Sequence, residues 1–131
     1  MVDADALIDY MRSSFLDGGL DGDRLADDVV IEWPFAAAGR PRRVDGREQF
    51  LAMAGPARAA LPFRLDEFEV SAVHETTDPD VVVVEYRLGG VIGGDRRSAA
   101  FVAVIRQRDG LIAGWREYQD TFAMIQAMAG S

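Results

Sequence analysis

The chain has 131 residues, a formal net charge of −8 and no cysteine, with 49% hydrophobic and 27% charged residues. These values predict one soluble globular domain over residues 1–131. They exclude disulfides and thiol catalysis, and they argue against nucleic-acid binding, which needs an excess of basic groups.

No apolar run approaches the roughly 20 residues of a membrane span, and the first residues lack the basic start of a signal peptide. We therefore expect a cytoplasmic protein with no membrane partner. His74 is the single histidine, and neither a multi-histidine site nor a phosphate-binding loop is present, so we expect no metal and no cofactor.

The chain begins with a predicted helix. Apolar residues at helical spacing indicate a helix over residues 4–16, with Asp3 or Asp5 as its N-cap. The glycine pair 18–19 should end it, because glycine adopts the backbone conformation that closes helices. The acidic segment 20–27 then predicts a short helical turn.

A strand and a second helix follow. The segment VVIEWPF, residues 29–35, favours a strand that Pro34 ends. Residues 36–46 predict a loop. Asp45 followed by Glu48 resembles a capping box, which predicts a helix that starts there.

The second half of the chain alternates with period two, which predicts strands. The alternation slips near Asp66, which indicates a bulge, and the glycine-rich residues 89–97 predict a connection. Asp109-Gly110 is the strongest hairpin signal. The strands are expected over residues 63–73, 81–88, 98–108 and 111–120, and a terminal helix over residues 121–130.

Helices followed by an antiparallel meander are typical of an α+β domain. We expect a cone-shaped, curved antiparallel sheet packed on three N-terminal helices. Such a sheet can enclose an internal apolar pocket, which at this length would hold one small ligand.

Three segments resemble a known family: LADDVVIEWPF, GRPRRVDGREQF and DGLIAGWREYQDTFAMIQAMAG. They are similar to the SnoaL-like branch of the nuclear transport factor 2-like superfamily, and the resemblance covers nearly the whole chain. That branch includes polyketide cyclases, phenazine-biosynthesis proteins and limonene-type epoxide hydrolases. The resemblance implies a homodimer that binds small hydrophobic molecules, often as an isomerase, cyclase or hydrolase without a cofactor.

The chain departs from two residue sets of these relatives. Trp33 stands where the steroid isomerases of this fold carry their general base, and Val102 or Val104 falls where they carry a second acid. The Arg-x-Asp pair of the epoxide hydrolases aligns with Tyr86 and Leu88. Neither chemistry is therefore expected in its usual form, and Glu117 is the family carboxylate that the chain retains.

Glu117 is the candidate acid/base. Strand alternation places Trp115, Glu117 and Gln119 on one side, and the resemblance places that side inside the cone. A carboxylate beside an indole in an apolar cavity has a raised pKa, which suits proton transfer. Two alternatives stay open: Glu117 lies in water at the mouth of the cone, or it pairs with an arginine. The residues expected to bind substrate are Trp33, Tyr86, Val102, Val104, Trp115 and Gln119, although plain core packing also explains each aromatic residue.

Other polar residues have simpler expected roles. Glu32 is a reserve acid, because a register error of one residue would exchange it with Trp33. His74 precedes a polar turn and is expected to be exposed. Asp120, or else Thr121, should cap the terminal helix. The arginines of the loop over the cavity either clamp an anionic substrate or are solvated: Arg40, Arg42 and Arg43.

The sequence thus predicts a cofactor-independent enzyme that performs acid/base chemistry on a small hydrophobic metabolite, by isomerisation, cyclisation or hydrolysis. A polyketide or another natural-product intermediate is the kind of substrate that the resemblance implies. The alternative is a non-catalytic ligand-binding or dimerisation module of the same fold, because a fold does not imply a function.

Overall fold

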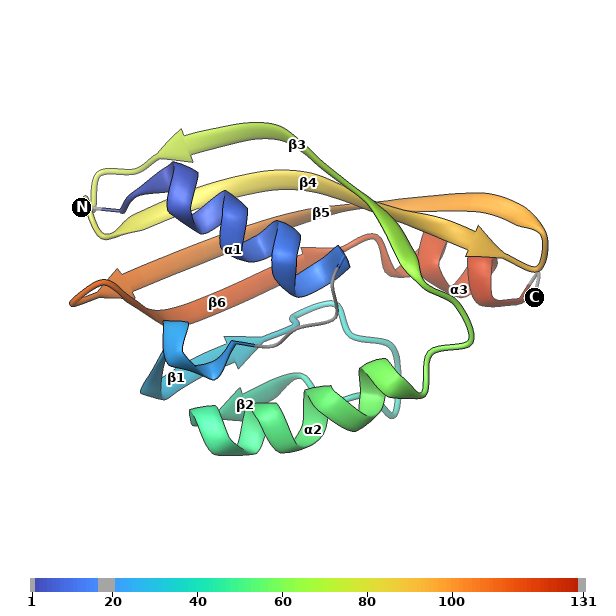
Figure 1. The fold of residues 1–131 in the computed structure, drawn as a ribbon, viewed down its shortest axis with the longest axis horizontal. Coiled ribbons are helices and arrows are strands. Elements are labelled where there is room, and N and C mark those ends of the chain that lie inside the picture. The colour runs from blue at the N-terminus through green and yellow to red at the C-terminus, as the bar shows by residue number, and fades with distance from the viewer. Residues whose placement is uncertain (1, 17–20, 130–131) are drawn as a thin grey trace.

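The computed structural model describes residues 2–16 and 21–129. Helices occupy both ends of the chain, and a meander of four long strands lies between them (Figure 1). The elements in chain order are α1 (Ala4–Leu16), η1 (Gly22–Arg24), β1 (Leu25–Glu32), β2 (Arg43–Asp45), α2 (Arg47–Ala59), β3 (Leu65–Glu75), β4 (Val81–Ile92), β5 (Asp95–Arg108), β6 (Leu111–Gln119) and α3 (Thr121–Ala129).

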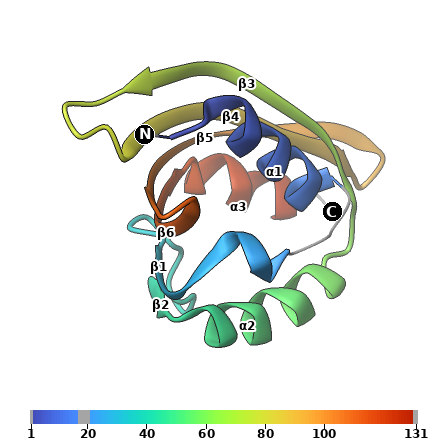
Figure 2. The same ribbon diagram turned by 60° about the vertical axis from the view of Figure 1, so that its left-hand side comes forward.

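The strands form one curved sheet in the order β2-β1-β6-β5-β4-β3. The sheet curls around α1, and α2 lies across its open side (Figure 2). The α+β architecture is confirmed, but the sheet is not fully antiparallel, because β1 pairs with β6 in parallel. The sequence pattern identifies strands but not which strands are neighbours. Here β2, α2 and three strands of the meander lie between β1 and β6 in the chain.

The predicted hairpin turn and the predicted bulge of the second half are both confirmed. Asp109 and Gly110 have φ angles of 55° and 78°, as a two-residue hairpin turn requires. The register of β3 against β4 shifts between Leu65 and Glu67, at the predicted bulge. The glycine-rich connection is shorter than predicted, because β4 continues to Ile92 and turns through two glycines before β5 begins.

Of the predicted helix starts, the one at Asp3 is confirmed and the one at Asp45 is wrong. The Asp3 carboxylate accepts a hydrogen bond from the Ala6 amide at 3.1 Å and caps α1. The capping box at Asp45 is wrong, because Asp45 belongs to β2 and pairs with Val30, so Gly46 takes the N-cap position of α2. The predicted helical turn is limited to η1, and residues 25–27 belong to β1. The glycine pair 18–19 lies outside the described residues.

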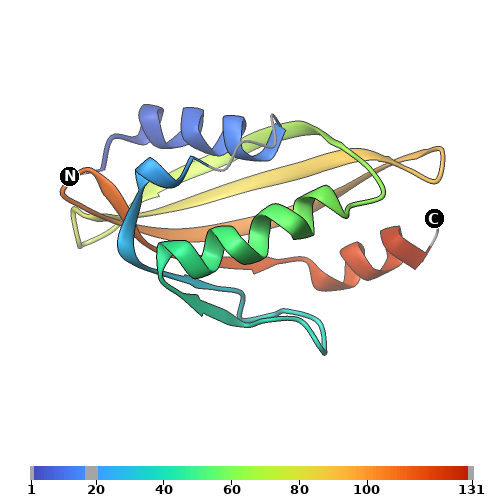
Figure 3. The same ribbon diagram turned by 60° about the horizontal axis from the view of Figure 1, so that its bottom comes forward.

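Helices α1 and α2 lie on the same side of the sheet, and α3 extends from the end of β6 (Figure 3). The side chains that face these helices form the core. Leu7 and Met11 of α1 are fully buried, as are Val84, Ala103 and Ile105 of the central strands. The remaining question is what the polar residues of this inner face do.

Candidate functional site

Glu117 lies on the inner face of the sheet. In the ladder between β5 and β6 it stands opposite Ala103, and Trp115 and Gln119 share its side. Its residue surface is only 9% exposed. The alternative of a carboxylate in water is therefore excluded, since Glu117 is among the buried residues of the core.

Two donors hold the Glu117 carboxylate. The Tyr86 hydroxyl donates to Oε1, and the Trp33 indole nitrogen donates to Oε2 at 3.2 Å. Tyr86 reaches Glu117 from β4, two strands away across β5. Trp33 reaches it because it directly follows β1, which runs parallel to β6 with Ile31 beside Trp115.

Burial raises the pKa of Glu117, because the charged carboxylate has lost its water. The hydrogen bonds from Tyr86 and Trp33 and the positive charge of Arg58 oppose this rise. Burial also raises the pKa of Tyr86 well above its ordinary value, and the negative charge of Glu117 adds to that effect. Tyr86 therefore stays a proton donor, and Glu117 is the group in this pair that can take up and release a proton.

Arg58 is the cation whose charge lowers the pKa of Glu117. The sequence analysis did not identify it. It lies in the last turn of α2 and donates a hydrogen bond to the Ser14 carbonyl of α1. Its guanidinium lies 5.5 Å from the centre of the Phe15 ring. Partial burial lowers its pKa, but it stays charged, and it supplies a positive field toward Glu117 without a direct ion pair.

Aromatic rings surround the Tyr86–Glu117 pair. Phe15 of α1 lies 5.6 Å from Tyr86 and 6.5 Å from Trp115, measured between ring centres. Phe101 stacks on Tyr86, at 5.3 Å and an interplanar angle of 10°. The apolar spacing of residues 4–16 predicts the helix that carries Phe15, and only the fold shows that Phe15 packs beside Tyr86.

An apolar cavity of about 590 Å³ lies beside this cluster. It is bounded by α2, by α3 and by the ends of β4 and β5 where they form their hairpin. Trp33, Phe101 and Gln119 line it, whereas Glu117 and Tyr86 do not. Trp33, which donates to Glu117, and Phe101, which stacks on Tyr86, thus form a wall one residue thick between the cavity and the buried pair.

The predicted site residues divide between the two faces of the sheet. Trp33, Tyr86 and Glu117 meet inside, joined by hydrogen bonds. Val102 and Val104 lie on the opposite, outer face, because they alternate with the buried Phe101, Ala103 and Ile105. Their assignment to the ligand pocket therefore has to be corrected, since every second residue of a strand points away from the core.

The remaining polar candidates lie away from Glu117. Glu32 lies on the outer face, and in the two strand ladders its register partners are Arg43 and Arg116. His74 is exposed, as predicted, and its Nε2 lies 2.5 Å from a carboxylate oxygen of Glu85. Within the described residues no group of three or more histidine, aspartate or glutamate side chains is arranged to hold a metal ion.

The loop arginines separate from one another. Arg40 lines the cavity. Arg42 donates to the Pro34 carbonyl at 3.0 Å, and Arg43 forms an ion pair with Asp45 at 2.9 Å. The loop therefore brings one guanidinium to the cavity and uses the other two to hold its own conformation.

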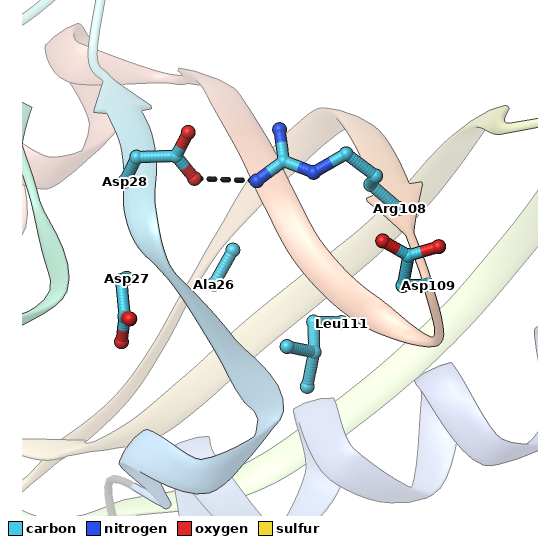
Figure 4. Close-up of a pocket in the computed structure, with 6 residues that line it drawn as sticks. All are labelled: Ala26, Asp27, Asp28, Arg108, Asp109 and Leu111. Atoms are coloured by element: carbon cyan, nitrogen blue, oxygen red, sulfur yellow. Dashed lines mark hydrogen bonds and ion pairs between the residues drawn. The ribbon is translucent and has the colours of Figure 1, made fainter.

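A second hollow lies at the opposite end of the sheet, between β1 and the β5–β6 turn (Figure 4). An ion pair of 2.5 Å between Arg108 and Asp28 bridges it, and 54% and 70% of these side chains are exposed. Charges in water interact weakly, and no buried polar group faces this hollow. We therefore place the candidate site at Glu117 and the apolar cavity.

Comparison with known proteins agrees with this architecture. The chain is 29% identical over 103 residues to an uncharacterised PhzA/B-like protein of Pseudomonas aeruginosa, which covers 77% of this chain and 71% of that protein. The crystal structure of a candidate isomerase from Bacillus subtilis superposes with a TM-score of 0.84 at 22% identity, over 100% of this chain and 98% of the other.

A phenazine biosynthesis-related protein of Pseudomonas aeruginosa superposes with a TM-score of 0.71 at 19% identity, over 97% of this chain and 84% of the other. At such identities these structures establish the fold alone. Within the described residues, no helix is long and apolar enough to cross a membrane. The SnoaL-like domain family matches residues 5–115, and the chain belongs to that family.

Proposed function

We propose that this protein is a cofactor-independent enzyme in which Glu117 transfers a proton to and from a small hydrophobic substrate. The observation that carries the proposal is a buried carboxylate with a raised pKa that forms no ion pair with any described residue, one residue away from an apolar cavity. Keeping a carboxylate in such a place costs stability. Perturbed carboxylates of this kind are frequent at active sites.

In this proposal the substrate occupies the cavity, and its reacting C–H or O–H group reaches Oε2 of Glu117 by displacing the Trp33 indole. The ionised carboxylate accepts the proton, and the resulting acid returns it to another position of the same substrate. Tyr86 keeps its own proton throughout and donates its hydrogen bond to Oε1, which orients the carboxylate. Isomerisation and cyclisation can both begin with such a step, and in a hydrolysis the carboxylate takes the proton from the attacking water instead.

The second candidate function is a non-catalytic binding module. It is favoured by the fact that both oxygens of Glu117 already accept a hydrogen bond from the protein. A polar group that is satisfied in this way specifies core packing without any chemistry. The two functions therefore differ in whether a ligand in the cavity exchanges a proton with Glu117.

Exchange of hydrogen for deuterium tests this difference. The probe is 2-tetralone, an aromatic ketone with acidic α-hydrogens, incubated in D2O with the protein and followed by NMR. We expect exchange above the rate in buffer, and a fall of roughly 10²–10⁴-fold in Glu117→Gln. The exposed variant His74→Gln should exchange like the wild type. If 2-tetralone quenches tryptophan fluorescence saturably but Glu117→Gln does not slow its exchange, the binding module is the correct function.

We also propose a homodimer formed through the outer face of the sheet. The half-buried residues Val83, Val102, Val104 and Tyr118 form an apolar strip there. Sedimentation equilibrium at micromolar concentration should give twice the mass of the chain. Val104→Arg should give monomers, because it places a charge in the strip beside Arg116. A monomeric wild type would refute this assembly. The cytoplasmic location stays a prediction from the sequence.

A further inference from the structure

The charged residues that line the cavity are basic. Among the residues that the structure describes they are Arg40 and Arg97, and no described aspartate or glutamate lines the cavity. The chain as a whole has 22 acidic and 14 basic residues. A cavity whose described charged lining is entirely basic, in a protein with an acidic surplus, has an electrostatic preference opposite to that of the rest of the surface.

Arg97 belongs to the inner face of the sheet. It stands opposite Gly90 in the ladder and shares its side with Phe101 and Ala103. Ala103 in turn stands opposite Glu117. From Ala103 to Arg97 the strand advances by about 20 Å, at roughly 3.4 Å per residue. The guanidinium therefore lies at the outer end of the same face whose inner end carries Glu117.

Neither cavity arginine is strongly engaged with the protein. Within the described part of the chain, Arg40 forms no ion pair, and the partner of Arg97 is Asp95, at 3.7 Å and with 74% of its side chain exposed. Their neighbours differ. Arg96 binds Asp66 through two hydrogen bonds of 3.0 Å, and Arg42 donates to a backbone carbonyl. Both arginines that line the cavity are therefore available for a ligand.

We propose that the cavity binds an elongated apolar molecule with one carboxylate, whose carboxylate lies at Arg97 and Arg40 and whose apolar body extends toward Trp33 and Phe101. Guanidinium groups form strong charge-assisted hydrogen bonds with carboxylates. The negative charge of Glu117 at the far end opposes the reverse orientation. This inference rests on the proposed function only in taking the cavity as the substrate site, and it adds the substrate class.

The orientation has a chemical consequence. The carboxylate of the ligand lies far from Glu117, so the atom that exchanges a proton is not next to the carboxylate. After allowance for the reach of the arginine side chain, the two are separated by on the order of 15 Å, given the strand rise used above. An acyl chain of about ten carbons, or a fused aromatic acid, has this length.

The experiment compares probes that share a decyl chain and differ in the head group: decanoate, 1-decanol and decyltrimethylammonium. Binding is followed by tryptophan fluorescence, because Trp33 lines the cavity, and by calorimetry. We expect decanoate to bind most tightly and the cation most weakly. Arg97→Gln and Arg40→Gln should each weaken decanoate about tenfold or more, since each loses a charged hydrogen bond. Neither should change the binding of 1-decanol by more than about twofold, because its hydroxyl carries no charge.

Arg96→Gln is the matched control and should bind decanoate like the wild type, because Arg96 is held by Asp66 and does not line the cavity. Equal affinity for the acid and the alcohol, equal weakening of both by Arg97→Gln, or no saturable binding of decanoate would overturn the proposal. The deuterium exchange of 2-tetralone is measured separately. If decanoate binding depends on the arginines but 2-tetralone exchange does not depend on Glu117, the catalytic proposal alone is refuted. If exchange depends on Glu117 but decanoate binding does not depend on the arginines, the substrate class alone is refuted.

Discussion

Replacing Glu117 by glutamine should change how the stability of the protein depends on pH. Glutamine keeps the size of the side chain and can accept the hydrogen bond from Trp33, and its amide can donate to the Tyr86 hydroxyl. The variant removes the charge and leaves most of the packing in place. Any difference that grows with pH therefore reports the cost of ionising Glu117 in the core.

The sign follows from the raised pKa of Glu117 in the folded protein. The unfolded chain ionises this group near pH 4.3, whereas the folded protein ionises it only at a higher pH. The stability that this residue contributes is thus fully present below pH 4.3 and is lost as the pH rises through the folded pKa. Over that window the wild type should lose up to about 1.4 kcal/mol per pH unit relative to Glu117→Gln, and the difference should then level off.

The assay is urea unfolding between pH 4 and pH 8, followed by the fluorescence of Trp33 and Trp115. The exposed carboxylates Asp28, Asp66 and Asp78 have lowered pKa values and cause the opposite trend. They are the same in both proteins, so the difference between the two curves isolates Glu117. A difference that is flat, or that falls as the pH rises, would refute the account of Glu117 as a poorly solvated carboxylate.

Glu117→Ala separates the hydrogen bonds from the charge. It leaves the Tyr86 hydroxyl and the Trp33 indole without their acceptor. One buried and one partly buried donor without partners cost about 2–6 kcal/mol together. We therefore expect Glu117→Ala to be clearly less stable than Glu117→Gln at pH 7. Equal stability of the two variants would mean that these donors readily find other acceptors.

Two further predictions concern the elements around the cavity. A Cβ atom at Gly90 would lie 2.4 Å from the Arg64 carbonyl oxygen, so Gly90→Ala should lower the free energy of unfolding by about 1–3 kcal/mol. The control is Gly114→Ala, because the nearest atom to a Cβ there is 3.6 Å away. Equal urea midpoints for the two variants would contradict the prediction. Asp120 accepts a hydrogen bond from the Ala123 amide at 3.0 Å and caps α3, so Asp120→Ala should cost about 1 kcal/mol, measured by thermal unfolding, with an unchanged transition as the contrary result.

Local patterns predicted those features that depend on neighbours in the chain. The alternation in residues 111–120 placed Trp115, Glu117 and Gln119 on one face, because a strand can do nothing else with successive side chains. The cap of α3 at Asp120 and the turn at Asp109-Gly110 were equally local. The local signal failed where a segment distant in the chain made a competing interaction. Asp45 pairs with Val30 of β1 and therefore lies in β2, so it does not cap α2.

By itself the sequence determined the long strands of the second half, the main helices, the residues that share a side with Glu117 and the SnoaL-like character of the chain. Only the tertiary structure decided what Glu117 meets. Tyr86 and Trp33 are 31 and 84 positions away in the chain, and they converge because β1 runs parallel to β6 while β4 lies two strands away. The outward placement of Val102 and Val104 and the presence of Arg40 and Arg97 at the cavity were decided in the same way. Contacts between distant segments depend on register and strand order, and no periodicity within a segment carries that information.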